Sequence, residues 1–173
     1  MALRLDGGQV SGVNERASSP GGARRGLRAE GRPLLSLRMP GHFIRRLQQV
    51  AVKLFAEELA HADITPVQYA ALTAVSQRPR IDQATLSSLI GYDRATIGGV
   101  VDRLEAKGWL ARSADAGDRR LKRLTLTGAG HQVLREVTPA VQKVQARLVE
   151  PLAAPERRQF EHLCLKLLAH HLG

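Results

Sequence analysis

Five positively charged side chains crowd around one turn in the segment RSADAGDRRLKRLTLT, residues 112–127. They are Arg112, Arg119, Arg120, Lys122 and Arg123. A hairpin at this place needs only a glycine and a turn-forming residue, and Gly117 and Asp118 supply both. Guanidinium groups bind phosphate oxygens through a planar pair of hydrogen bonds. The excess of arginine therefore predicts that this turn binds a polyanion.

The composition of the whole chain points the same way. The 173 residues carry a formal net charge of +10, and the isoelectric point is about 10.9. Such a charge attracts nucleic acid first and an anionic membrane second, although a merely basic surface is the plainer alternative. Apolar residues make up 43% of the chain but aromatic ones only 3%. Ala, Leu and Val must therefore build the core, which favours helices over a β-sandwich.

Several classes of protein are disfavoured by what the sequence lacks. No apolar run approaches the roughly 18 to 20 residues that span a bilayer, and no signal peptide is recognisable, so we expect a cytoplasmic protein. The single cysteine, Cys164, cannot form an internal disulfide. There is no GxGxxG, P-loop, HExxH or GxSxG motif, and no histidine spacing typical of zinc. We expect no enzyme, no cofactor and no metal.

Residues 1–38 differ from the rest of the chain. They are rich in Gly, Ser, Pro and Arg, and seven arginines against three acids place +4 of the net charge there. We expect a disordered basic arm. The alternative is that translation begins at Met39, in which case the arm is not part of the native protein.

Helices are expected on both sides of the charged turn. Apolar spacings of three and four predict a helix from Gly41 to about Ala62. Thr65 as N-cap and Pro66 at the first helical position begin a second helix. Beyond the turn, Thr127 begins a long helix with a possible kink at Pro139. A final helix with an apolar stripe follows from position 155 (Phe160, Leu163, Cys164, Leu167, Leu168 and His171).

Two shorter helices lie just before the turn. Asp82 caps the first, which Gly91 stops, and its apolar residues (Leu86, Leu89 and Ile90) are expected to face inward. Asp93 caps the second, whose inward face is expected to hold Ile97, Val100, Val101 and Leu104. The apolar period then changes to two, which predicts strands over WLARS and LKRLTLT. This order of elements is typical of a winged helix-turn-helix.

The opposite face of the second short helix is small and polar. It presents Arg94, Ala95, Gly98 and Gly99, flanked by Thr96 and Arg103. Two glycines cost a helix interior roughly 1 kcal/mol each relative to alanine, and close approach to DNA would compensate for that cost. The alternative is that the glycines let two helices pack together. We expect this face, with Gln83 and Thr85 of the preceding helix, to contact DNA.

The charged ribbon then becomes the wing of this fold. Its tip can place an arginine in the minor groove of DNA. We expect Asp115 and Asp118 to hold the turn and to orient the neighbouring arginines, together with Arg112. The alternative is a solvated hairpin whose charges have no role.

The segment TLSSLIGYDRATIGGVVDRLEAKGWLARSADAGDRRLKRLTLTGAG resembles the core of the MarR family of bacterial transcription regulators, most specifically in DRLEAKGWLAR and DRR…LTLTGAG. The resemblance covers residues 41–172. It implies a mainly α homodimer with β-wings, in which residues 39–62 and 127–173 dimerise and residues 63–126 form the winged helix-turn-helix. It implies recognition of a palindromic operator and binding of a small, often aromatic, effector. By the same analogy Arg119 and Arg120 are the wing contacts to DNA, and Asp118 orients them.

The predicted first helix also carries a candidate effector site. His42, Arg46 and Gln49 share one helical face, with Arg45 beside them, and together they could clamp a carboxylate. Tyr69 could close such a pocket. This segment is similar to regulators of aromatic-acid catabolism, including those of nicotinate degradation, which implies a repressor released by a hydroxynicotinate or hydroxybenzoate. The alternatives are a solvated or phosphate-binding helix end, redox sensing through Cys164, or a winged helix that binds only protein.

Overall fold

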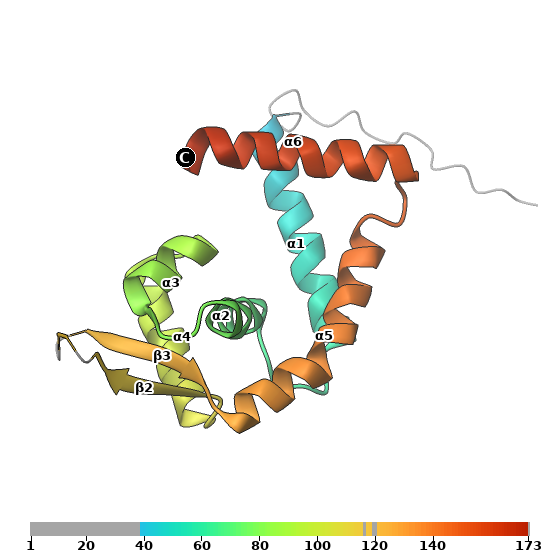
Figure 1. Ribbon diagram of the computed structural model, residues 1–173. Helices are drawn as coiled ribbons and strands as arrows, with labels where there is room; N and C mark the ends of the chain where they lie inside the picture. Colours follow the sequence, from blue (N-terminus) through green and yellow to red (C-terminus); the bar gives the residue numbers. More distant parts are fainter. Residues whose placement is uncertain (1–38, 116, 119–120, 173) are drawn as a thin grey trace, which may run out of the picture.

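The computed structural model describes residues 39–115, 117–118 and 121–172, which form six helices and a small antiparallel sheet (Figure 1). The helices are α1 (Pro40–Glu58), α2 (Pro66–Gln77), α3 (Gln83–Ile90), α4 (Arg94–Ala106), α5 (Gly128–Leu148) and α6 (Ala154–Leu172). The strands are β1 (Ile81–Asp82), β2 (Leu110–Ala114) and β3 (Lys122–Leu126), in the sheet order β1-β3-β2. The expected mainly α fold with a small β-wing is confirmed.

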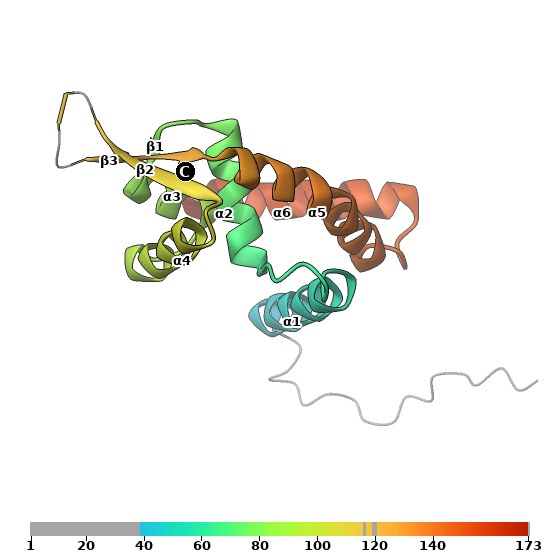
Figure 2. The same cartoon turned by 90° about the horizontal axis from the view of Figure 1, so that it is seen from below.

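The elements form two groups in space. Helices α2, α3 and α4 gather around the sheet, and the β2–β3 ribbon extends away from them in both views (Figures 1 and 2). Helix α5 leads from the sheet to the second group, where it packs along α1. Its course changes direction part-way along, although the helix continues without a break through Pro139.

Side-chain caps fix where the helices begin, as the sequence predicts. Thr65 forms a complete capping box with Gln68 at the start of α2. The carboxylate of Asp82 accepts the Thr85 N–H at 2.9 Å, and that of Asp93 accepts the Thr96 N–H at 2.8 Å. Such caps each stabilise a helix by about 1 kcal/mol. The starts of α2, α3 and α4 are therefore determined by residues close to them in the sequence.

One apolar cluster joins the sheet to the helices around it. The predicted inward face of α4 is completely buried, and Leu86 of α3 and Leu124 of β3 are buried with it. The prediction for Leu89 is wrong, because its side chain is 46% exposed. Ser87 takes the inward position instead, since its hydroxyl donates to the Tyr92 carbonyl at 2.7 Å and closes the turn before α4. An eight-residue helix thus buries a polar residue where a third apolar one was expected.

Two further differences concern the ends of elements. Helix α1 ends at Glu58, earlier than the predicted Ala62, because the backbone leaves helical geometry at Leu59, with φ at −114° and ψ at 22°. Leu59 is nevertheless buried, so the apolar spacing continues beyond the helix. Strand β1 was not predicted at all. Its two residues pair with β3 through Ile81↔Leu124 and Asp82↔Arg123, and two residues are too few to show a period.

Charged pairs fasten α1 to α5. Arg147 donates to Glu58 at 2.6 Å and to Glu57 at 3.0 Å, and Lys143 lies 2.8 Å from Glu58. The hydrogen bond from Lys143 lowers the pKa of Glu58, with Arg147 contributing. Because the pKa is lowered in the folded state, these contacts stabilise the helix pair at neutral pH and are lost as acid protonates the carboxylate.

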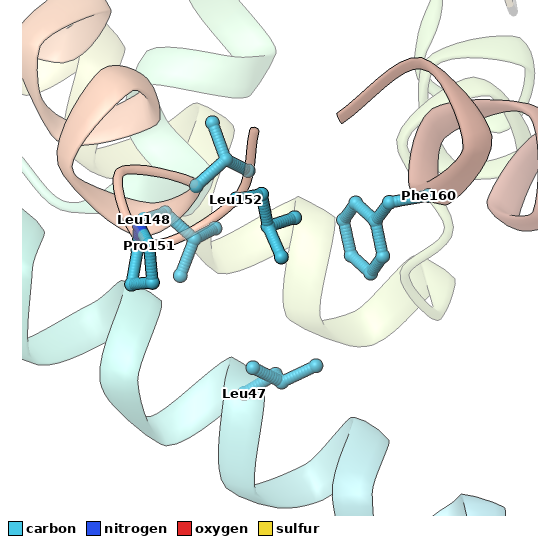
Figure 3. A pocket seen from close by; sticks show the side chains of 6 residues that line it. Leu47, Leu148, Pro151, Leu152 and Phe160 are labelled. Carbon is cyan, nitrogen blue, oxygen red and sulfur yellow. The ribbon is translucent and has the colours of Figure 1, made fainter. Parts of the chain in front are cut away.

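Much apolar surface of α1 and α6 is left uncovered within the single chain. No described residue of α6 is buried, and the predicted stripe of that helix exposes Phe160, Leu163, Leu167 and Leu168. A cavity of about 300 Å³ lies where α1, the α5–α6 turn and α6 meet, lined by Leu47, Leu148, Val149, Pro151, Leu152 and Phe160 (Figure 3). Among the described helices, none is long and apolar enough to cross a membrane.

The start of α5 requires a glycine at position 130. A Cβ atom there would lie 1.9 Å from the Trp109 carbonyl oxygen, a separation that real atoms do not reach. Around Gly128, two residues earlier in the same helix, a Cβ atom would meet nothing within 4 Å. We therefore expect Gly130→Ala to destabilise the fold by at least about 2 kcal/mol, and Gly128→Ala to change the stability by less than about 1 kcal/mol. Urea unfolding followed by circular dichroism measures both, and equal midpoints would contradict this packing.

Candidate nucleic-acid interface

The turn between α3 and α4 is locked by reciprocal bonds. Ser87 donates its hydroxyl to the Tyr92 carbonyl, and the Tyr92 N–H donates to the Ser87 carbonyl at 3.1 Å. Gly91 supplies the left-handed backbone, with φ at 73°, that this tight turn needs. Asp93 then accepts the Thr96 hydroxyl at 2.5 Å, a bond that lowers the pKa of Asp93. Helix α4 is thereby fixed in direction relative to α3.

The outer face of α4 is open to solvent. Arg94, Ala95, Thr96 and Arg103 are exposed, while Ile97, Val100, Val101 and Leu104 on the opposite face are buried. The two glycines lie between these faces and are half-buried. A Cβ atom on Gly98 would lie 3.3 Å from the Gln83 side-chain amide, whereas one on Gly99 would make ordinary contact with Arg103. Gly98 therefore serves packing against α3 as well as leaving the outer face small.

Arg112 holds the ribbon against α4. Its guanidinium group donates to Asp102 at 2.6 Å and to Glu105 at 2.7 Å, and its side chain is only 24% exposed. Both acids belong to α4, at positions three apart, so they share one edge of that helix. Arg112 is thus used for fixing strand β2 to α4. Lys107, at the end of α4, pairs similarly with Asp63 at 2.8 Å and lies 4.6 Å from the Trp109 ring centre.

Asp115 organises the described part of the ribbon's turn. One carboxylate oxygen accepts the N–H groups of Gly117 at 3.0 Å and Asp118 at 3.3 Å. The other accepts the Arg123 Nε–H at 2.5 Å. Together these bonds, that from Arg123 first, lower the pKa of Asp115. The predicted holding role of Asp115 therefore has a geometric basis.

Asp115 was expected to pair with a neighbouring arginine of the ribbon. Its carboxylate forms this pair with Arg123 on β3. Backbone bonds close the ribbon, from Asp115 N to Leu121 O and from Leu121 N to Asp118 O, both at 3.0 Å. Arg119 and Arg120, the expected wing contacts, lie outside the described residues, and so does the N-terminal arm at residues 1–38.

The candidate effector residues separate into two places. On α1, the Arg45 Nη2 and His42 Nδ1 atoms lie 3.5 Å apart, and Arg46 donates to Gln49 at 3.1 Å. The predicted residues lie along one side of the helix, where His42 is partly buried and the other three are exposed. Tyr69 lies on α2, and its hydroxyl is 3.5 Å from the Thr138 hydroxyl of α5. The contacts of the α1 residues thus run along their own helix, while Tyr69 faces α5.

Residues that the sequence analysis did not single out also take part in the interface. Asp102 and Glu105 are the acids that pair with Arg112. Their spacing of three residues, just before a strand that contains an arginine, could have predicted this pairing. Arg123 gave no such signal beyond its charge, because its two acidic partners come from different parts of the chain. Within the described ranges, no three His, Cys, Asp or Glu side chains gather where a metal ion could bind.

Comparisons with known proteins agree with this geometry. A family model described as the MarR family matches residues 64–122. The HTH-type transcriptional repressor NicR of Pseudomonas putida is 30% identical over 128 residues, which cover 74% of this chain and 81% of the relative. This relative is, by its name, a transcriptional repressor.

Solved structures of similar proteins share the fold. That of Bordetella bronchiseptica BpsR, described for the regulation of its DNA binding by 6-hydroxynicotinic acid, has a TM-score of 0.74 and 28% identity over 78% of this chain and 96% of that one. That of a mutant Escherichia coli MarR complexed with operator DNA has a TM-score of 0.71 and 27% identity over 78% of this chain and 94% of that one. The chain belongs to the MarR family of transcriptional regulators.

Proposed function

We propose that the protein is a homodimeric repressor that binds a palindromic operator and is released from it by a small aromatic acid. The observation that carries the DNA-binding part is the placement of α4. Its small, polar face is open, its apolar face is buried, and its edge is clamped to a basic ribbon by Arg112. This arrangement suits insertion of a helix into the major groove.

The contacts follow from this placement. We assign the outer residues of α4 (Arg94, Ala95, Thr96 and Arg103), with the half-buried Gly98 and Gly99 beside them, to base edges and adjoining phosphates. Gln83 and Thr85 at the start of α3 are assigned to the neighbouring phosphates. Arg119 and Arg120 are assigned to the minor groove beside the wing, with Asp115, Asp118 and Arg112 orienting the ribbon. The operator-bound E. coli MarR supports this mode of binding.

A second copy of the chain would cover the apolar surface that α1 and α6 expose. Phe43, Leu47 and Val50 on α1 are each about half exposed, as is the stripe of α6. Exposed apolar surface of this extent marks an association site. We therefore assign dimerisation to residues 39–62 and 127–173, and DNA binding to residues 63–126. A dimer would present two copies of α4 to two operator half-sites.

The effector part rests on the cationic start of α1. Arg45 and Arg46 are exposed there, and each contacts a side chain that is not an acid (His42 and Gln49), so neither is neutralised by an acid in its described contacts. A carboxylate would complete such a site. The relation of BpsR to 6-hydroxynicotinic acid supports an aromatic acid of this kind. Tyr69 would contribute only if binding brought α2 toward α1.

The first prediction from the proposed function concerns the wing. We expect Arg119→Ala and Arg120→Ala each to weaken operator binding roughly tenfold or more, because each removes a cation near the DNA. The fold and the oligomeric state should be unchanged. Footprinting on the DNA upstream of the gene locates the operator, and gel shifts measure the affinity. Arg158→Ala on α6 removes the same charge far from the wing and should bind like the wild type. Wild-type binding by both wing variants would refute the assignment.

The second prediction concerns the dimer. Leu167 lies on the apolar stripe of α6, whereas Leu165 is equally exposed but lies off that stripe. We expect the wild type and Leu165→Glu to show about twice the 18.9 kDa mass of the chain in sedimentation equilibrium, and Leu167→Glu to show one chain mass, because a buried unpaired carboxylate opposes association. A monomeric wild type, or identical behaviour of the two variants, would contradict the proposed surface.

The third prediction concerns the effector. Hydroxynicotinate or hydroxybenzoate at millimolar concentration should release the operator in a gel shift. Arg46→Gln should bind the operator normally but resist release, because it lacks the cation for the carboxylate. Lys53→Gln, which removes another exposed cation of α1, should be released like the wild type. If neither acid releases the operator, the result would count against an aromatic-acid effector.

A further inference from the structure

Arg123 lies at the centre of the small sheet. Strand β3 runs between β1 and β2, and the register places Arg123 opposite Asp82 on one side and Ser113 on the other. Its side chain is only 26% exposed. A cation so far removed from water requires compensating partners, and acids from two separate parts of the chain supply them.

The two acids do different structural work. Asp82 is the N-cap of α3, where its carboxylate holds the Thr85 N–H at 2.9 Å and the Thr85 hydroxyl at 2.7 Å. Asp115 holds the N–H groups of Gly117 and Asp118 and so shapes the turn of the ribbon. Each carboxylate therefore fixes the backbone of one segment that faces the proposed DNA site.

One guanidinium group joins these two carboxylates. The Nε atom donates to Asp115 at 2.5 Å, and Nη1 lies 3.7 Å from Asp82 and 3.5 Å from the Arg80 carbonyl oxygen. The side chains of Asp115 and Asp82 are only 19% and 26% exposed, so water screens these contacts less than it screens surface ion pairs. The planar fork of arginine reaches both acids at once, which a lysine ammonium group does not do with the same geometry.

Arg80, in the chain between α2 and β1, also contacts β3 and Asp115. Its backbone N–H donates to the Leu124 carbonyl at 2.9 Å, in a left-handed conformation with φ at 67° that is uncommon for a residue with a side chain. Its guanidinium group lies 3.9 Å from Asp115. The segment between α2 and β1 thus contacts the same Asp115 carboxylate that shapes the ribbon's turn.

We propose that Arg123 is a positioning residue that couples the wing to the start of α3 through Asp115 and Asp82, so that the ribbon and the helix-turn-helix meet DNA in one fixed relative orientation. This inference rests on the proposed DNA-binding function. It gives Arg123, like Arg112, a structural role that differs from that of the exposed cations of the ribbon. Its guanidinium group is engaged by protein acids, whereas Lys122 on the same strand is exposed.

The sign of an electrostatic effect separates this role from simple charge attraction. Asp115→Asn and Asp82→Asn each remove a negative charge, and charge alone would then raise the affinity for DNA. The proposal predicts the opposite, a loss of about tenfold for Asp115→Asn, because the amide no longer holds the guanidinium group. Glu136→Gln is the matched control. It removes an exposed acid on α5 that accepts a hydrogen bond from Gln132 of the same helix at 2.9 Å, and the affinity of this variant should equal or slightly exceed that of the wild type.

Arg123 itself is tested by two substitutions. Arg123→Gln should weaken binding, and Arg123→Lys, which keeps the charge, should restore little of the affinity. The loss in the double variant Arg123→Gln with Asp115→Asn should be close to that of either single variant, since both remove the same coupling. Affinities are measured on the duplex carrying the footprinted operator, at a temperature where circular dichroism shows every variant folded.

A hydroxyl-radical footprint supplies the readout that a purely structural role would not move. We expect the variants to lose protection at the flanks, where the wing lies, and to keep it over the segment read by α4. Affinity at or above the wild-type level in Asp115→Asn, full rescue by Arg123→Lys, or an even weakening of the whole footprint would each overturn the inference. A wild-type protein that protects no DNA would instead refute the proposed function itself.

Discussion

The two faces of α4 impose the constraint on which the rest of the structure depends. Four apolar side chains on one face are completely buried where α4 packs against α2, α3 and β2, so the helix cannot rotate without exposing them. Each would cost about 1.5 to 3 kcal/mol if returned to water. The opposite face must therefore point outward, and its small residues let another molecule come close to the backbone. Arg112 adds direction to this packing because it ties the outer edge of α4 to β2 at two carboxylates.

Charged contacts surround this apolar centre and link it to the ribbon. Arg112 joins β2 to α4, Lys107 joins the end of α4 to the chain before α2, and Arg123 joins β3 to the N-cap of α3. Several cations of a strongly basic protein are thus engaged by its own acids. The cations that fix the geometry of the fold are therefore different side chains from those that are left to attract a polyanion. Sequence composition alone does not reveal this division.

Local signals in the sequence predicted most of the elements, and non-local contacts account for the differences. The caps Thr65, Asp82 and Asp93 act within three residues of themselves, so their patterns are visible in the chain. Strand β1 exists only because β3 lies beside it. In the candidate interface, the helical spacing of the apolar residues of α4 was enough to predict which of its residues face outward. The acidic partners of Arg123 come from two separate parts of the chain that meet only in the assembled sheet, so their pairing was not predictable from spacing alone.

The dependence of DNA affinity on salt concentration tests the central claim most directly, because it counts the phosphates that the protein neutralises. Binding to the footprinted duplex should weaken steeply as salt rises, with a slope of roughly −0.9 in the log–log plot for each phosphate contacted. Two wings and two copies of α4 would together give a slope of several units. A flat response, or no binding to DNA at low salt, would contradict the account and favour a winged helix that binds protein.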